Sequence, residues 1–181
     1  MSEGLLNILE EQSAMGFTGK INVLLKKNSQ SFAVVLMHEG QLIHCLGANK
    51  SGEKALLDLI FQDVSSTYDF KLVVEPEVVT ADEGVFTWSV GELKKKSRSV
   101  YENYLSNQKL RPPSNLKLVI KSEFIIDGDE VLHHEFDVLS TISDYSRVQD
   151  IYENCSLLEY EITQALVSLR KKGAIKVLAG G

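Results

Sequence analysis

A short turn between two apolar runs constrains this sequence more than any other feature. Residues 32–38 and 41–47 are rich in side chains that favour β-strands, and Glu39-Gly40 separates them. Glycine at the second position of a two-residue turn takes a positive φ without steric cost, as the tight turn of a β-hairpin requires. The sequence therefore predicts a β-hairpin over residues 32–47.

The register of this hairpin decides which side chains share a face of the sheet. A two-residue turn places Met37 opposite Leu42 and Val35 opposite His44. Both strands are apolar on both faces for most of their length, a pattern typical of strands that lie in the centre of a sheet and are covered by helices. We therefore expect the hairpin to be central.

Helical and strand-like patterns surround the hairpin and predict an α+β module. Apolar side chains recur on one face of two segments, as in amphipathic helices, and alternate in two others, as in half-buried strands. The expected elements are a helix over residues 5–15 capped by Ser2, a strand over 20–26, a helix over 51–61 and a strand over 67–74. Their order predicts an antiparallel sheet with packed helices in a domain of residues 1–76.

Three helical patterns and then a strand pattern characterise the C-terminal part of the chain. The helices are expected over residues 130–142, 146–154 and from Ser156 or Leu157 to Lys172, and Gly173 ends the last one before a strand over 174–178. Three short helices and a strand are the plan of a winged helix. We predict a small winged-helix-like domain over residues 130–181.

Residues 77–129 form a linking region whose main feature is a helix expected over residues 89–110. Its first half is basic and its second half aromatic, with Lys94, Lys95, Lys96 and Arg98 preceding Tyr101 and Tyr104. Basic runs on helices usually form a solvated face. Aromatic and basic side chains together also suit the centre of a protein interface, so these six residues are the candidate partner-binding site. A strand over residues 116–120 and a turn over 126–129 complete the region.

The charge balance and the cysteines bear on location and partners. With 25 acidic and 19 basic residues the net charge is -6, which disfavours a general attraction to nucleic acid or anionic lipid. Cys45 and Cys155 do not form a CxxC pair, which fits a reducing compartment. The sequence contains no leader pattern and no run of about 18 apolar residues, so we expect a cytoplasmic protein without membrane insertion.

Five segments of the N-terminal half succeed one another at characteristic spacings. They are Leu5-Leu6, Phe17-Thr18-Gly19-Lys20-Ile21, the run from His38 to His44, the run from Ser51 to Leu57, and Tyr68-Asp69-Phe70. With this combination, residues 5–74 resemble the PATAN domain, a bacterial module often found beside receiver domains. The resemblance implies a protein-interaction module of bacterial signalling, in some members acting on type IV pilus or surface-motility machinery, and it brings no catalytic residues. The winged-helix-like part is similar to the C-terminal segment of some PATAN-domain proteins.

Histidine and cysteine side chains in the hairpin raise the question of a metal site, because imidazole and thiolate bind zinc. Adjacent residues of a strand point to opposite faces, so His44 and Cys45 cannot share a metal. His133 and His134 lie about 100 degrees apart on the expected helix, so the two imidazoles point in different directions. No phosphate-binding glycine pattern, calcium loop or GxSxG motif occurs. We therefore expect no metal, cofactor or catalytic site.

Two functions fit these features. The first is a non-enzymatic regulatory adaptor that binds another bacterial protein through the sheet edge, the basic helix or both. The second is a transcription regulator that binds DNA through the winged helix. A recognition helix reads the groove with its N-terminal residues, where Glu159 and Glu161 would repel phosphate, so nucleic acid is the less favoured partner. A sheet edge must be paired or covered, and for that reason a homodimer is also expected.

Overall fold

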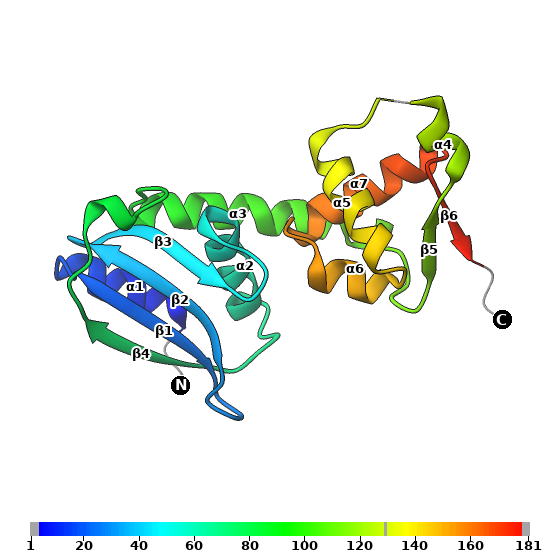
Figure 1. Ribbon diagram of the computed structural model, residues 1–181. Helices are drawn as coiled ribbons and strands as arrows, with labels where there is room; N and C mark the ends of the chain where they lie inside the picture. The colour runs from blue at the N-terminus through cyan, green and yellow to red at the C-terminus, as the bar shows by residue number, and fades with distance from the viewer. Residues whose placement is uncertain (1–3, 129, 179–181) are drawn as a thin grey trace. The chain divides into compact units, whose positions relative to one another are not determined.

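The computed structural model of the protein describes residues 4–128 and 130–178 (Figure 1). The chain divides into two compact units, Met1–Tyr101 and Glu102–Gly181. Ser2, which the sequence predicts as a helix cap, lies outside the described residues. The fold class is α+β, with an antiparallel sheet and packed helices, as the sequence predicts.

The first unit is built around a four-stranded sheet. It contains α1 (Leu5–Ala14), β1 (Gly19–Leu25), β2 (Ser31–His38), β3 (Gln41–Gly47), α2 (Gly52–Val64), β4 (Phe70–Pro76), η1 (Ala81–Glu83) and most of α3 (Val90–Asn107). The strands pair antiparallel in the order β3-β2-β1-β4. The predicted order of helices and strands around the hairpin is therefore confirmed.

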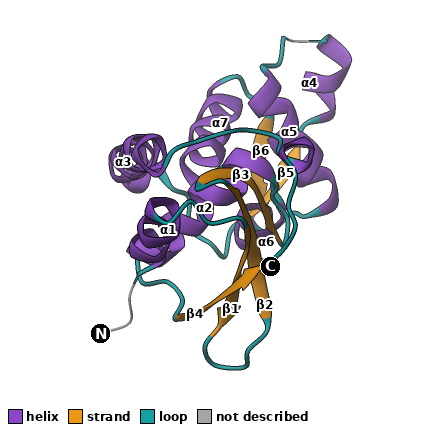
Figure 2. Cartoon of the chain, turned by 90° about the vertical axis from the view of Figure 1, so that its left-hand side faces the viewer, coloured by secondary structure: helices purple, strands orange, loops and turns teal. Residues whose placement is uncertain are grey.

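The helices of this unit cover one face of the sheet. Figure 2 shows α1, α2 and α3 on the same side of the four strands. An apolar core fills the space between the two layers, where Val35 and Met37 of the sheet join Leu9, Leu56 and Leu93 of the helices. The prediction of a hairpin that is central and covered by helices is right for β2 only. β3 is an edge strand, and residues 85–88 cover part of that edge.

A β-bulge in the hairpin corrects the predicted register. Met37 lies opposite Leu42 as expected, but Val35 lies opposite Cys45 and not opposite His44. Ile43 is the extra residue on β3, and its carbonyl accepts hydrogen bonds from the amides of residues 85 and 86 at 3.0 and 3.2 Å. Leu42 and Trp88 also exchange two backbone hydrogen bonds of 2.9 Å each. Residues 85–88 thus pair with the outer edge of β3, and the bulge is where that pairing replaces the regular ladder.

The second unit has the three predicted helices and the strand after them. Its elements are η2 (Gln108–Leu110), β5 (Lys117–Ile120), α4 (Ser122–Asp127), α5 (His133–Asp144), α6 (Val148–Asn154), α7 (Glu159–Lys171) and β6 (Ile175–Leu178). β6 pairs antiparallel with β5. The turn predicted over residues 126–129 is corrected in part. α4 occupies its beginning and ends at Asp127, Gly128 follows as the C-cap with φ 70°, and Asp129 lies outside the described residues.

Residues 77–129, predicted as one linking region, contribute to both units. Trp88 and Leu93 belong to the core of the first unit, and Leu118 and Phe124 belong to the core of the second. The chain passes from one unit to the other within α3, between Tyr101 and Glu102. The first half of the predicted basic and aromatic helix is therefore part of the first unit.

Candidate functional site

The N-terminal end of α3 is fixed by a capping box. The Ser89 amide donates a hydrogen bond to Glu92 Oε2 at 2.8 Å, and the Glu92 amide donates one to Ser89 Oγ at 3.2 Å. The hydrogen bond from the Ser89 backbone lowers the pKa of the Glu92 carboxyl. Beyond this cap, Val90 and Leu93 enter the core of the first unit and orient the helix on it. The opposite side of α3 carries the charged residues.

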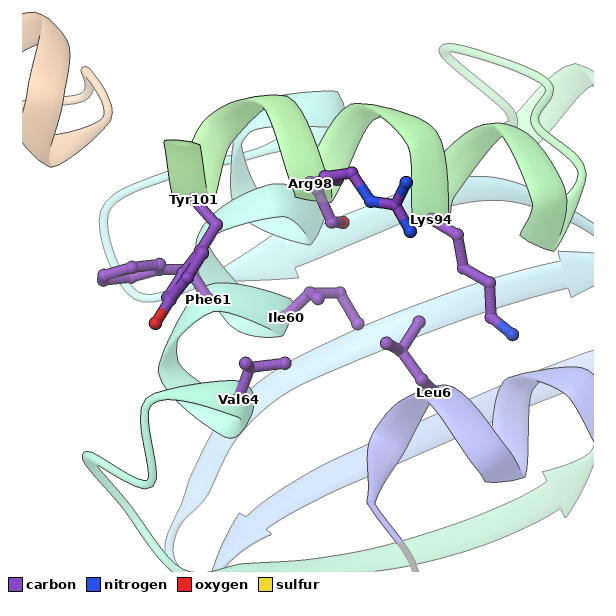
Figure 3. A pocket seen from close by; sticks show the side chains of 8 residues that line it. Leu6, Ile60, Phe61, Val64, Lys94, Arg98 and Tyr101 are labelled. Carbon is purple, nitrogen blue, oxygen red and sulfur yellow. The ribbon is translucent and has the colours of Figure 1, made fainter. Parts of the chain in front are cut away.

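A pocket of about 300 Å³ lies between α3 and the two helices beside it (Figure 3). Its walls are mostly apolar, and it is lined by Leu6 of α1, by Ile60, Phe61 and Val64 of α2, and by Lys94, Ser97, Arg98 and Tyr101 of α3. We call this hollow the α3 pocket. Every residue that lines it belongs to the first unit.

The two ends of the α3 pocket differ in chemistry. The rings of Phe61 and Tyr101 contact each other at one end, with their centroids 6.4 Å apart. Lys94 and Arg98 lie toward the other end, where Figure 3 also shows Leu6, and Ile60 and Val64 lie between the aromatic rings and Lys94. The pocket therefore presents an apolar surface that leads to positive charge.

The two cations of the pocket are in different electrostatic situations. Lys94 forms an ion pair with Glu10 of α1. Arg98 is exposed, and no ion pair to it occurs within residues 4–128 and 130–178. An exposed guanidinium without a fixed partner is available to a carboxylate, with which it makes strong two-point hydrogen bonds.

A polar atom of the pocket wall also lacks a partner. Ser97 Oγ is buried and makes no hydrogen bond to the described part of the protein. On α3 it is one turn from Lys94, and Ser97, Lys94 and Arg98 all line the α3 pocket. Buried hydroxyls normally find a hydrogen-bond partner, because leaving one unpaired costs free energy.

The structure brings three of the six predicted partner-binding residues to this pocket, namely Lys94, Arg98 and Tyr101. Lys95 is exposed beside it without lining it, and the Lys96 ammonium lies 4.4 Å from the centre of the Trp88 ring. Tyr104 belongs to the second unit. The Lys96 contact is a cation–π interaction inside the first unit.

The sequence prediction does not include the residues of α1 and α2 that complete the pocket. Leu6, Ile60 and Phe61 read as parts of ordinary amphipathic helices, and nothing in their spacing indicates that one wall stays open. Val64, the last residue of α2, is 56% exposed in the structure, which the sequence pattern of α2 does not indicate.

The cysteine and histidine of β3 lie on opposite faces, as their adjacent positions predict. Cys45 is buried in the core, and this burial together with the nearby Asp58 raises the pKa of its thiol to about 12. Asp58 forms an ion pair with Lys50, with 3.7 Å between Oδ2 and Nζ. His44 is half-buried on the other side. Among the described residues no group of three histidine, cysteine or acidic side chains is placed to hold a metal ion.

The start of α7, where a winged helix would read DNA, carries carboxylates. Glu159 accepts a hydrogen bond of 2.7 Å from Arg111 Nη1, and the Arg111 guanidinium lies 4.3 Å from the centre of the Tyr152 ring. Glu161 accepts a hydrogen bond from the Leu158 amide at 2.8 Å and caps the helix. The Arg111 guanidinium beside this helix end is thus already engaged by an acidic residue of the same unit.

Comparisons with known proteins give no match. No family model matches the chain, and neither a curated protein nor a solved structure matches it. In the described part of the chain, no helix has both the length and the apolar character needed to cross a membrane.

Proposed function

We propose that this protein is a non-enzymatic regulatory adaptor that binds another protein through the exposed surface of α3 in its first unit. The observation that carries the proposal is the convergence of Arg98, Tyr101 and the apolar wall of the α3 pocket on one exposed surface. Arginine and tyrosine beside an apolar hollow are the composition of the energetically dominant centre of protein interfaces.

The charge of this surface defines the kind of partner. Lys94, Lys95 and Arg98 form a cationic strip on a protein whose net charge is -6. A complementary partner presents carboxylates, because matched potentials speed association and exclude wrong partners. The resemblance to PATAN domains supports a bacterial signalling or motility protein as this partner, in the cytoplasm. A homodimer that forms away from the covered β3 edge remains part of the proposal.

A photo-crosslinking experiment in the native cell tests this proposal. A benzophenone amino acid replaces Tyr101 in one variant and Tyr145 of the second unit in the other; these tyrosines are 41% and 40% exposed, so they are matched controls. We expect a specific crosslinked protein from position 101 and none from position 145.

A charge reversal then asks whether the cationic strip selects the partner. Arg98→Glu is expected to abolish the crosslink from position 101, whereas Lys26→Glu, at an exposed lysine after β1, leaves it unchanged. A crosslink that survives Arg98→Glu, or that forms equally well from position 145, would remove the α3 surface from the proposal.

A further inference from the structure

The α3 pocket has the polarity of a site for an amphipathic anion. Phe61, Val64 and Tyr101 supply apolar surface, and Lys94 and Arg98 supply positive charge at the other end (Figure 3). Two acidic residues of α1 and α2 beside the pocket already have partners. Glu10 pairs with Lys94, and Asp63 Oδ2 accepts a hydrogen bond from the Leu5 amide at 2.9 Å. An incoming carboxylate therefore meets Arg98, which has no such partner within the described residues.

The unpartnered hydroxyl of Ser97 is an independent indication of a polar ligand group. Its oxygen is buried, lines the pocket, and makes no hydrogen bond to the described residues. A hydroxyl in a wholly apolar ligand site would stay unpaired at a cost, whereas a carboxylate oxygen accepts its proton. Ser97 is the neighbour of Arg98 in the chain and lines the same pocket, so a head group at Arg98 has this hydroxyl nearby.

The size of the pocket limits the length of the ligand. Its volume of about 300 Å³ is at the lower end of the range for small-molecule sites. At roughly 30 Å³ for each water-sized group, it has room for roughly ten non-hydrogen atoms. We propose that the α3 pocket binds a free, linear medium-chain carboxylate of the size of octanoate, with its carboxylate at Arg98 and Ser97 and its chain against Phe61, Val64 and Tyr101.

This ligand site goes beyond the proposed adaptor function and does not rest on it. Octanoate in the pocket neutralises the charge of Arg98. If the proposed function holds, octanoate therefore also weakens the binding of an acidic protein partner. The binding of octanoate to the isolated protein is measured without any partner, and its failure is therefore distinct from a failure of the adaptor proposal.

Chain-length and head-group series test the proposal in solution. The ¹⁵N-labelled full-length protein is titrated with octanoate, hexanoate, octan-1-ol and octyltrimethylammonium, and amide shifts are recorded. We expect saturable shifts at the residues of α1, α2 and α3 that line the pocket. Hexanoate should bind about fifteenfold more weakly than octanoate, since each buried methylene contributes about 0.8 kcal/mol. Octan-1-ol should bind at least about tenfold more weakly, because a hydrogen bond to a charged group is lost.

Three variants separate the roles of charge, hydroxyl and general attraction. Arg98→Gln should weaken octanoate binding about tenfold, whereas Lys95→Gln, at another exposed cation that lies outside the pocket, should leave it unchanged. Ser97→Ala should weaken binding without lowering the unfolding midpoint, because the hydroxyl it removes is unpaired in the free protein.

Four results would overturn the proposal. They are an absence of saturable shifts, shifts that map to other surfaces, octan-1-ol binding as tightly as octanoate, and equal effects of Arg98→Gln and Lys95→Gln. An apolar side chain of a protein partner would then be the better occupant of the pocket.

Discussion

Glu135 is the residue whose replacement tests most directly how the second unit is stabilised. Its side chain is 0% exposed, and Lys172 Nζ donates a hydrogen bond to its Oε2 at 2.6 Å. The Leu132 amide donates to the same oxygen at 2.8 Å and so caps α5. Burial alone would raise the pKa of this carboxyl, but the hydrogen bonds, led by that of Lys172, outweigh it and lower the pKa from 4.5 to about 2.

The lowered pKa sets how much stability the replacement of Glu135 removes and the pH range in which that loss appears. At about 1.4 kcal/mol for each pKa unit, the charged form of Glu135 contributes on the order of 3 kcal/mol to the free energy of unfolding. A carboxyl with a lowered pKa stabilises the folded state above its unfolded pKa, and this contribution disappears as the pH falls from about 4.5 to about 2. Glu135→Gln should therefore lose this stability at pH 7, and the two proteins should converge towards pH 2.

Urea unfolding between pH 7 and pH 2.5 measures this difference. Far-ultraviolet circular dichroism and hydrogen exchange in α5 and α7 report on the second unit, while fluorescence of Trp88, the protein's one tryptophan, reports on the first. Glu161→Gln is the matched control, because Glu161 makes the same capping hydrogen bond on α7 but is only half-buried. This variant should lose only about 1 kcal/mol of the free energy of unfolding. Equal losses in the two variants, or a Glu135→Gln loss that does not change with pH, would refute this reasoning.

Three further predictions concern the first unit. Gly40→Ala should cost about 1–3 kcal/mol, since φ is +77° and the new Cβ would lie 2.6 Å from a carbonyl oxygen of α1, whereas Gly16→Ala, with φ +65° and open space, should cost less in the same urea titration. Lys50→Met should lower stability by at most about 3–5 kcal/mol, the cost of breaking a fully buried pair, because it removes the ion-pair partner of the largely buried Asp58. Because burial raises the pKa of Asp58, the unfolding midpoint of this variant should recover as the pH falls and the carboxyl is protonated. Cys45, whose thiol pKa is about 12, should resist iodoacetamide at pH 8 until the unit unfolds, as peptide mass spectrometry would record.

The elements that could be predicted from the sequence are those specified by local patterns. Glu39 and Gly40 take φ values of 47° and 77° in the hairpin turn, as a two-residue turn between two apolar runs requires. The amphipathic helices and the strand after Gly173 also result from periodicity and from a helix-ending glycine. In each case the determining residues lie within a few positions of one another.

The features that could not be predicted depend on contacts between distant segments. At the bulge, the carbonyl of Ile43 accepts hydrogen bonds from residues 85 and 86, which lie about forty positions further along the chain. The contact of Lys96 with Trp88 could not be predicted for a different reason. The sequence pattern predicts this helix as a separate linking element and not as part of a core. The α3 pocket joins residues from α1, α2 and α3, and no local pattern relates Leu6 to Arg98.

Residues 85–88, which pair with the edge of β3, also protect the protein against aggregation. An exposed strand edge is a template on which other chains can add as strands. Here the chain uses its own backbone to occupy part of the β3 edge. At the opposite edge, β4 carries exposed Lys71 and Glu75 and ends in Pro76, three features that discourage strand addition. The same loop that shapes the hairpin therefore also helps to keep copies of this protein from joining sheet to sheet.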